Sequence, residues 1–238
     1  MELLVVGVVL VILWGILSPV FPSNPRQKSA SQLCMQNLRQ VTLAMTMLSA
    51  DNEEKSLMQA AKAQSGQPLA PYPGTFPTMT GAGPDELWKL YLTMQPYQRD
   101  PKVFRCPSEP EIKKPAVESN QRMKAPDPLA YYSTSSNAFS YFLNVDAKTG
   151  PDSPILAGDS HLSLDPAGTD ENPGQVELKG EKRMGAETAK DLRWTKSRHA
   201  GQGVVAFGDG HAEVLTSRRL RTIWANPTNS GVRIWLPN

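Results

Sequence analysis

The sequence predicts an α+β fold in which a long N-terminal helix packs on an antiparallel β-sheet head with long, proline- and glycine-rich loops. Three stretches carry this prediction: an apolar segment at the start, an amphipathic stripe after it, and a hairpin signal near residue 209. We expect residues 1–21 to form a hydrophobic helix that spans a membrane or fills a filament core. Residues 22–60 should form an amphipathic helix that packs on the head, and residues 61–238 one globular α+β head.

The apolar segment has no ionisable side chain between Glu2 and Arg26. As a helix, residues 3–21 would be about 28 Å long at ~1.5 Å per residue, enough to cross a hydrocarbon core. No face of that helix would be polar, so its neighbours should be lipid or other apolar helices. The segment therefore predicts a single helix that spans a membrane or fills a filament core. The nearest cations, Arg26 and Lys28, would by themselves place the head in the cytoplasm, and a basic leader upstream of Met1 would reverse that bias.

Apolar side chains then recur at steps of 4, 3, 4 and 3 residues, at Cys34, Leu38, Val41, Met45 and Leu48. This spacing places them on one stripe of a helix. Because a one-sided stripe needs an apolar partner, we expect it to pack on the sheet of the head.

Asp209-Gly210 lies between two apolar runs, which is a strong short-range signal for a β-hairpin. A two-residue type I′ turn there would place Phe207 opposite Ala212 and Val205 opposite Val214. Those four side chains would share the core face, with His211 on the other face.

Further elements are expected around these stretches. Strands are predicted at 138–145, 153–157 and 231–236, a short helix at 85–94 and another beginning near Ser217. Residues 62–84 and 160–190 should be loops, since prolines and glycines or polar side chains dominate them.

Several of these features together resemble type IV pilins and type II secretion pseudopilins. They are Glu2 at the edge of the apolar run, Pro19 seventeen residues later, the helix over 31–52, the cysteine segment 100–108, and His199 followed after nine residues by Asp209-Gly210. The last feature resembles the His-x9-Asp-Gly box of a bacterial branch of pilin-like proteins, the prepilin-type processing-associated family. The order of the features is more specific than any one of them.

The resemblance implies a structural subunit of a pilus or pseudopilus filament, held in the inner membrane before assembly. Its partners would be copies of itself and the pilus or secretion assembly machinery. Glu2 would pair with the N-terminal amine of a neighbouring subunit, since a charge in a dry core needs an opposite charge. Gly7 and Gly15 would allow close approach of helices, and Pro19 and Pro22 would let the helix bend. In the family a basic leader precedes the glutamate, so we expect the natural start to lie upstream of Met1.

The two cysteines, Cys34 and Cys106, are expected to form a disulfide. Cys34 lies on the stripe that faces the head, and Cys106 follows the apolar pair Val103-Phe104, which should be buried beside it. A head outside the cytoplasm would favour the bond. The alternative is two buried free thiols.

The three histidines are His161, His199 and His211. His199, Asp209 and His211, joined by Asp159 and His161 from another loop, could be drawn as a metal site. Their spacing matches no established ligand pattern, so we expect no metal or cofactor. The box of His199, Asp209 and Gly210 is instead predicted to be structural, with His199 bonding near the Asp209 turn. Residues 165–171 offer oxygens for calcium but no recognisable binding loop.

Enzymatic chemistry has little support in the sequence. Ser160 lies in no nucleophile elbow, and a phosphate-binding glycine loop is lacking. The formal charge of +2 does not indicate nucleic acid as a partner. The alternative to a filament subunit is a membrane-anchored extracytoplasmic binding module, with a tethered enzyme third.

Overall fold

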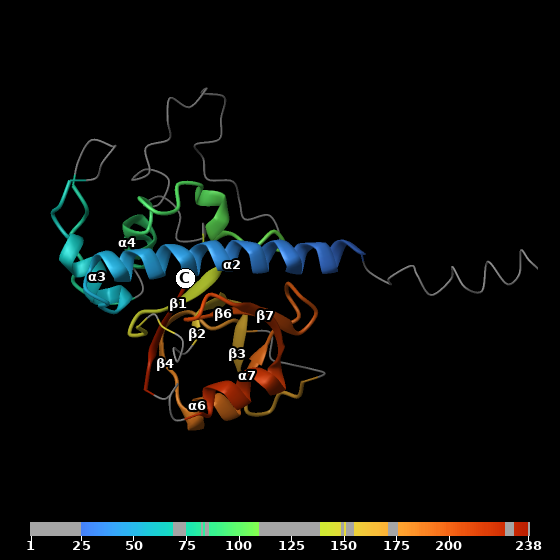
Figure 1. Cartoon of the computed structure of the whole chain (residues 1–238). Helices are drawn as coiled ribbons and strands as arrows, with labels where there is room; N and C mark the ends of the chain where they lie inside the picture. The colour runs from blue at the N-terminus through green and yellow to red at the C-terminus, as the bar shows by residue number, and fades with distance from the viewer. Residues whose placement is uncertain are drawn as a thin grey trace, which may run out of the picture.

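The computed structural model describes residues 25–68, 75–81, 83, 86–109, 139–148, 150, 155–170, 176–226 and 231–237, with the backbone alone for 25–28. It is an α+β structure with an antiparallel sheet, as predicted. One long helix, α2, crosses the face of a six-stranded sheet, and smaller helices lie on both sides of this pair (Figure 1).

Helix α2 (Pro25–Asp51) begins at a proline, which is compatible with the first turn of a helix because that turn needs no backbone donor. All five side chains of the predicted stripe are buried, and they pack against strands of the sheet. The prediction of an amphipathic helix on the head is therefore confirmed for this part of the chain.

The structure corrects the prediction that the first half of the long helix is hydrophobic. The first helix that the structure describes begins at Pro25, and its outward side carries polar and charged side chains such as Gln36 and Arg39. Among the described residues, no helix has the length and the apolar character needed to cross a bilayer. The prediction of a hydrophobic-then-amphipathic helix is therefore wrong for this structure. The predicted location, the inner membrane and an extracytoplasmic filament, rested on that helix and is wrong with it. The predicted assembly residues Glu2, Gly7, Gly15, Pro19 and Pro22 lie outside the described residues.

The main sheet has the strand order β4-β8-β1-β2-β6-β7, and every neighbouring pair is antiparallel. Its strands are β1 (Tyr141–Asn144), β2 (Ile155–Asp159), β4 (Gly180–Arg183), β6 (Gln202–Phe207), β7 (Ala212–Thr216) and β8 (Arg233–Leu236). A second, two-stranded sheet pairs β3 (Leu162–Leu164) with β5 (Leu192–Trp194).

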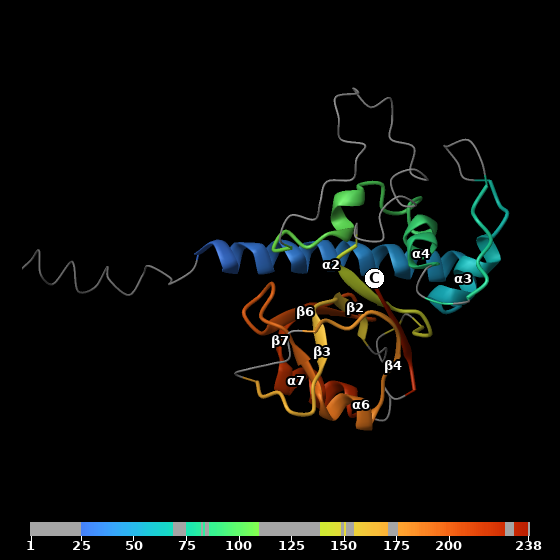
Figure 2. The same cartoon turned by 180° about the vertical axis from the view of Figure 1, so that it is seen from behind.

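Both faces of the main sheet are covered, which gives the molecule two apolar cores. Successive side chains of a strand point to opposite faces. Val204 and Ala206 of β6 accordingly join the core under α2, whereas Val205 joins the second core with Trp194 and Trp224. Helices α6 (Ala186–Lys190) and α7 (Ser217–Trp224) close this second core on the side away from α2 (Figure 2).

Three short helices flank α2. They are α3 (Leu57–Gln64), α4 (Leu87–Thr93) and the 3-10 helix η3 (Pro101–Phe104). Tyr91 of α4 stacks on Phe139 with 4.0 Å between ring centroids, and its hydroxyl donates to the carbonyl of Tyr141 at 2.7 Å. These contacts join the helical layer to the first strand of the sheet.

The hairpin at Asp209-Gly210 exists, but its predicted register is wrong by one residue. Ala206 pairs with Ala212 and Val205 with Glu213, so the loop is longer than two residues. Gly210 donates to the carbonyl of Phe207 at 3.0 Å and has φ +87°, whereas Asp209 is not in the left-handed region. This is the pattern of a type I turn followed by a left-handed glycine, not of a type I′ turn. The one-residue change moves Leu215 into the core and leaves Val214 partly exposed.

Residues 160–190 were expected to be a surface loop, and this expectation is also wrong. The described part of the segment contains β3, β4 and α6. Leu162, Met184 and Ala189 are buried in the second core. Elements of three to five residues are too short to show a clear hydrophobic period, so the polar surroundings dominated the prediction.

Candidate functional site

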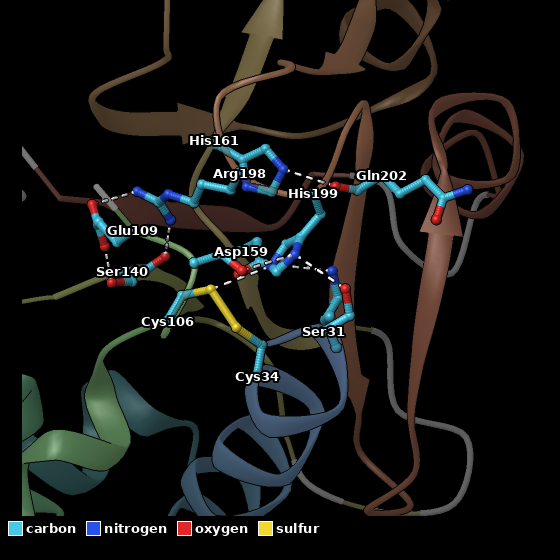
Figure 3. A network of polar contacts seen from close by, with 12 residues as sticks. Ser31, Cys34, Cys106, Glu109, Ser140, Asp159, His161, Arg198, His199 and Gln202 are labelled. Atoms are coloured by element: carbon cyan, nitrogen blue, oxygen red, sulfur yellow. Dashed lines mark hydrogen bonds and ion pairs between the residues drawn. A yellow bond between two sulfur atoms is a disulfide. The ribbon is translucent and has the colours of Figure 1, made fainter. Parts of the chain in front are cut away.

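Four residues with metal-ligating or redox-active side chains meet between α2 and the main sheet (Figure 3). We call Cys34, Cys106, Asp159 and His199 the His199 cluster. Cys34 comes from α2, Cys106 follows η3, Asp159 ends β2, and His199 precedes β6. Each residue is at most 3 % exposed. The cluster therefore joins four segments that are far apart in the sequence.

The predicted disulfide between Cys34 and Cys106 is present, with 5.2 Å between the two Cα atoms. It links residues 72 positions apart and holds the segment after η3 against α2. A cross-link over so long a loop restricts the unfolded chain strongly. Both cysteines of the chain are used in this bond.

His199 contacts the disulfide with one ring nitrogen and two serines with the other. Its Nε2 lies 3.2 Å from Cys106 Sγ and 3.5 Å from Asp159 Oδ2. Its Nδ1 lies 3.1 Å from Ser31 Oγ and 3.3 Å from Ser108 Oγ. The imidazole is thus held at both nitrogens between α2, the cysteine segment and the sheet.

Asp159 is a buried carboxyl with one satisfied oxygen. Its Oδ2 accepts a 2.7 Å hydrogen bond from the backbone N–H of Val204, while its Oδ1 has no hydrogen-bond partner among the described residues. Burial raises the pKa of Asp159 to about 7, against the opposing effect of the Val204 hydrogen bond. Burial and the nearby charge of Arg198 lower the pKa of His199 to about 4. Their 3.5 Å contact is therefore not an ion pair at neutral pH, because the imidazole is uncharged there.

Arg198 forms a second polar centre beside the cluster. Its guanidinium donates to Glu109 Oε1 at 2.7 Å and to the carbonyl of Ser140 at 2.9 Å. The hydroxyl of Ser140 donates to the other Glu109 oxygen. Burial raises the pKa of Glu109, and Arg198 opposes that rise. This ion pair holds the chain beyond Cys106 against β1.

His161 lies beside His199 and is also buried. Its Nε2 donates to the carbonyl of Gln202 at 2.8 Å, and its ring centroid lies 5.0 Å from that of Trp194 and 5.7 Å from that of His199. Burial and the charge of Arg198 lower its pKa to about 3, so it is neutral at physiological pH. Because its nitrogen is engaged by backbone, His161 supports the turn before β6.

The predicted contact between His199 and the Asp209 turn is absent. The two residues lie at opposite ends of β6, whose six residues separate them by roughly 20 Å at about 3.3 Å per residue. Asp209 Oδ1 instead accepts from the backbone and the Nδ1 of His211, at 3.0 and 2.5 Å, on the surface. The box is therefore two separate features: a buried histidine before β6 and an exposed glycine turn after it.

Of the residues drawn as a possible metal site, the structure brings together His199, Asp159 and His161 and leaves Asp209 and His211 outside. It adds the two cysteines, which the sequence linked only to each other. The antiparallel pairing of Gly158 with Val205 places the end of β2 beside the start of β6. The sequence analysis did not predict this strand pairing, and the pairing is what brings Asp159 next to His199.

In the oxidised state the cluster offers no reactive nucleophile, because both sulfurs are in the disulfide and all four side chains are buried. Its chemistry in this state is that of a cross-link with a buried polar network around it. Compared with known protein families, curated proteins and solved structures, the chain shows no match.

Proposed function

We propose that this chain is a structural subunit of a filament of the type IV pilin or pseudopilin kind, in which neighbouring copies contact one another through their N-terminal helical regions. The observation that carries the proposal is the second, outward face of α2. Leu33, Leu43 and Met47 are 46 %, 59 % and 46 % exposed, so this helix keeps large apolar side chains in solvent.

These three side chains lie within a narrow arc of the helix, at about 100° per residue. The centre of this arc lies about 140° around the helix from the centre of the stripe that packs on the sheet. Figure 1 shows α2 running across the sheet, with its N-terminal end extending past the sheet edge. A helix that is buried on one side and carries three exposed apolar side chains among polar ones on the other suits an interface with another subunit.

The occupant that we infer is a second copy of the chain. Residues 3–21, which precede α2 in the sequence, contain no charged side chain, so removing their apolar surface from water favours contact with other apolar surfaces. Staggered copies of one helix make a head-to-tail contact that does not close, and such a contact produces a filament. The pilin-like order of helix, cysteine segment and His-x9-Asp-Gly box supports the same assignment.

The test is site-specific photo-crosslinking of the full chain in the cells that produce it. A photoreactive residue at Leu43 or Met47 should give a ladder of dimers, trimers and larger multimers of the chain. The same residue at Arg219, which is exposed on α7 beyond the sheet, should give no ladder. Absence of a ladder at both α2 positions would overturn the proposal. Crosslinks from Leu43 to one different protein would favour the alternative, a binding module.

A further inference from the structure

The His199 cluster contains the donor atoms of a metal site. One ligand atom from each of Cys34, Cys106, Asp159 and His199 lies within 4.8 Å of every other (Figure 3). In the structure the two sulfurs bond to each other, and the remaining two donors, His199 Nε2 and an Asp159 oxygen, face them.

We propose that reduction of the Cys34–Cys106 disulfide converts the His199 cluster into a tetrahedral binding site for one divalent transition-metal ion of the zinc type. The disulfide and the metal are then two alternative ways of closing the same junction between α2 and the sheet. This inference is independent of filament assembly.

The donor set suits zinc chemically. Zinc is bound tetrahedrally by thiolate, imidazole and carboxylate, at about 2.3, 2.0–2.1 and 2.0–2.2 Å respectively. Ligand atoms around such an ion are roughly 3.3–3.8 Å apart, which follows from those bond lengths and tetrahedral angles. The present separations fall within 4.8 Å, so the two sulfurs must move apart as their bond breaks and the more distant donors must approach by about 1–1.5 Å.

A second observation concerns the carboxyl of Asp159, which keeps one oxygen available for coordination. Asp159 is fully buried, yet its Oδ1 has no hydrogen-bond partner among the described residues. A buried carboxyl oxygen without a partner is costly. Coordination of an ion would satisfy Asp159, while the bond from the Val204 N–H to Oδ2 would keep the side chain oriented.

The surroundings of His199 also match those of a ligating histidine. Such a histidine coordinates through one nitrogen and donates its other N–H to a fixed acceptor. Nε2 of His199 faces the sulfurs, and the hydroxyl oxygens of Ser31 and Ser108 stand at 3.1 and 3.3 Å from Nδ1. The imidazole therefore needs no rotation to present Nε2 to an ion.

A dithiol supplies the electrons and protons that reduction of the Cys34–Cys106 disulfide requires. The dithiol gives two electrons and two protons to the Cys34–Cys106 bond and becomes a disulfide, while the two cysteines become thiols. The metal ion then displaces one proton from each thiol and binds the two thiolates. A disulfide oxidant would reverse the conversion: it takes two electrons from the two thiolates and, with two protons from solvent, becomes two thiols, while the Cys34–Cys106 bond re-forms and the ion is released.

The experiment refolds the full chain from denaturant with a dithiol present, with and without Zn²⁺ or Co²⁺, and removes free metal by gel filtration. The reduced chain should retain one metal ion per chain by elemental analysis and recover its near-ultraviolet circular dichroism. Its cobalt form should show the visible bands of tetrahedral Co²⁺ and a thiolate-to-cobalt charge-transfer band. The oxidised chain should retain no metal.

Matched variants assign the ligands. The cobalt spectrum should be abolished by His199→Ala and also by the double substitution Cys34→Ser and Cys106→Ser. The control is His211→Ala, which changes the exposed histidine and should leave the spectrum intact. Asp159→Asn can still accept from the Val204 N–H, so it should fold in the oxidised state and bind cobalt more weakly. Ser31→Ala should weaken binding by about 10–100-fold, as loss of an outer hydrogen bond does at other metal sites.

Three results would overturn the proposal. They are a reduced chain that refolds without taking up metal, a reduced chain that regains no tertiary signal at any metal concentration, and equal loss of cobalt in the His199→Ala and His211→Ala variants.

Discussion

Trp194 lies so close to Gly203 that a Cβ atom on Gly203 would stand 2.6 Å from the indole ring carbons. The tryptophan belongs to β5 of the small sheet, and the glycine to β6 of the main sheet. Trp194 is completely buried. The glycine at this position is therefore required by close packing of the two sheets and not by a special backbone angle.

Gly203→Ala should lower the free energy of unfolding by about 1–3 kcal/mol, because the added methyl group must displace the indole or the strand. Urea unfolding followed by circular dichroism measures the change. Gln202→Ala, at the exposed neighbouring position, is the control and should stay within about 0.5 kcal/mol of the wild type. Equal stabilities of Gly203→Ala and the wild type would show that the contact can relax at no cost.

Met45→Asp should unfold the head or lower its stability by more than about 3 kcal/mol, since it places an unpaired charge between α2 and the sheet. Met45 is 2 % exposed, whereas Leu43 on the same helix is 59 % exposed. Leu43→Asp should therefore melt close to the wild-type temperature. Thermal melts of the two variants make the comparison, and similar melting temperatures would contradict the assigned faces of α2.

Gly210→Val should lower stability by about 1–3 kcal/mol through backbone strain. Gly210 has φ +87°, and nothing lies within 4 Å of the place that a Cβ atom would occupy, so crowding contributes nothing. Gly210→Asn is the matched control, because asparagine tolerates the left-handed region better than a β-branched residue does. Denaturant unfolding should rank the wild type above Asn and Asn above Val; a reversed order of the two variants would refute the strain argument.

Glu86 should make the protein sensitive to acid. Burial alone would raise its pKa, but hydrogen bonds from Lys89 and from Thr80 and Gly81 outweigh burial and lower it to about 2. A carboxyl with a lowered folded pKa stabilises the fold above its unfolded pKa of 4.5, and this contribution is lost as the pH falls toward 2. At pH 6, Glu86→Gln should therefore be less stable than the wild type by up to about 3 kcal/mol.

Unfolding curves between pH 6 and 2.5 measure this effect, and the difference between Glu86→Gln and the wild type should shrink steadily as the pH falls. Glu187→Gln is the control, since the ion pair of Glu187 with Lys190 is solvent-exposed and should contribute almost nothing. A difference that stays constant over this range would mean that the carboxylate charge of Glu86 does not stabilise the fold.

Local patterns in the sequence were sufficient for several elements. The stripe from Cys34 to Leu48 predicted the buried face of α2, because helical spacing alone decides which side chains share a face. The Asp209-Gly210 pair located the hairpin, since few residues other than glycine adopt positive φ. The disulfide followed from there being only two cysteines, each beside apolar residues that were expected to be buried.

The sequence by itself thus determined what depends on neighbours along the chain: the amphipathic helix, the turn and the identity of the cross-linked pair. The tertiary structure alone decided the hairpin register, the second core and the meeting of His199 with Asp159 and the disulfide. The register depends on one residue of loop length, and both faces of β6 are apolar, so the hydrophobic pattern could not choose between alternatives. His199 and Asp159 meet because β2 pairs with β6, and that pairing is a long-range choice that the spacing of residues in the sequence does not record.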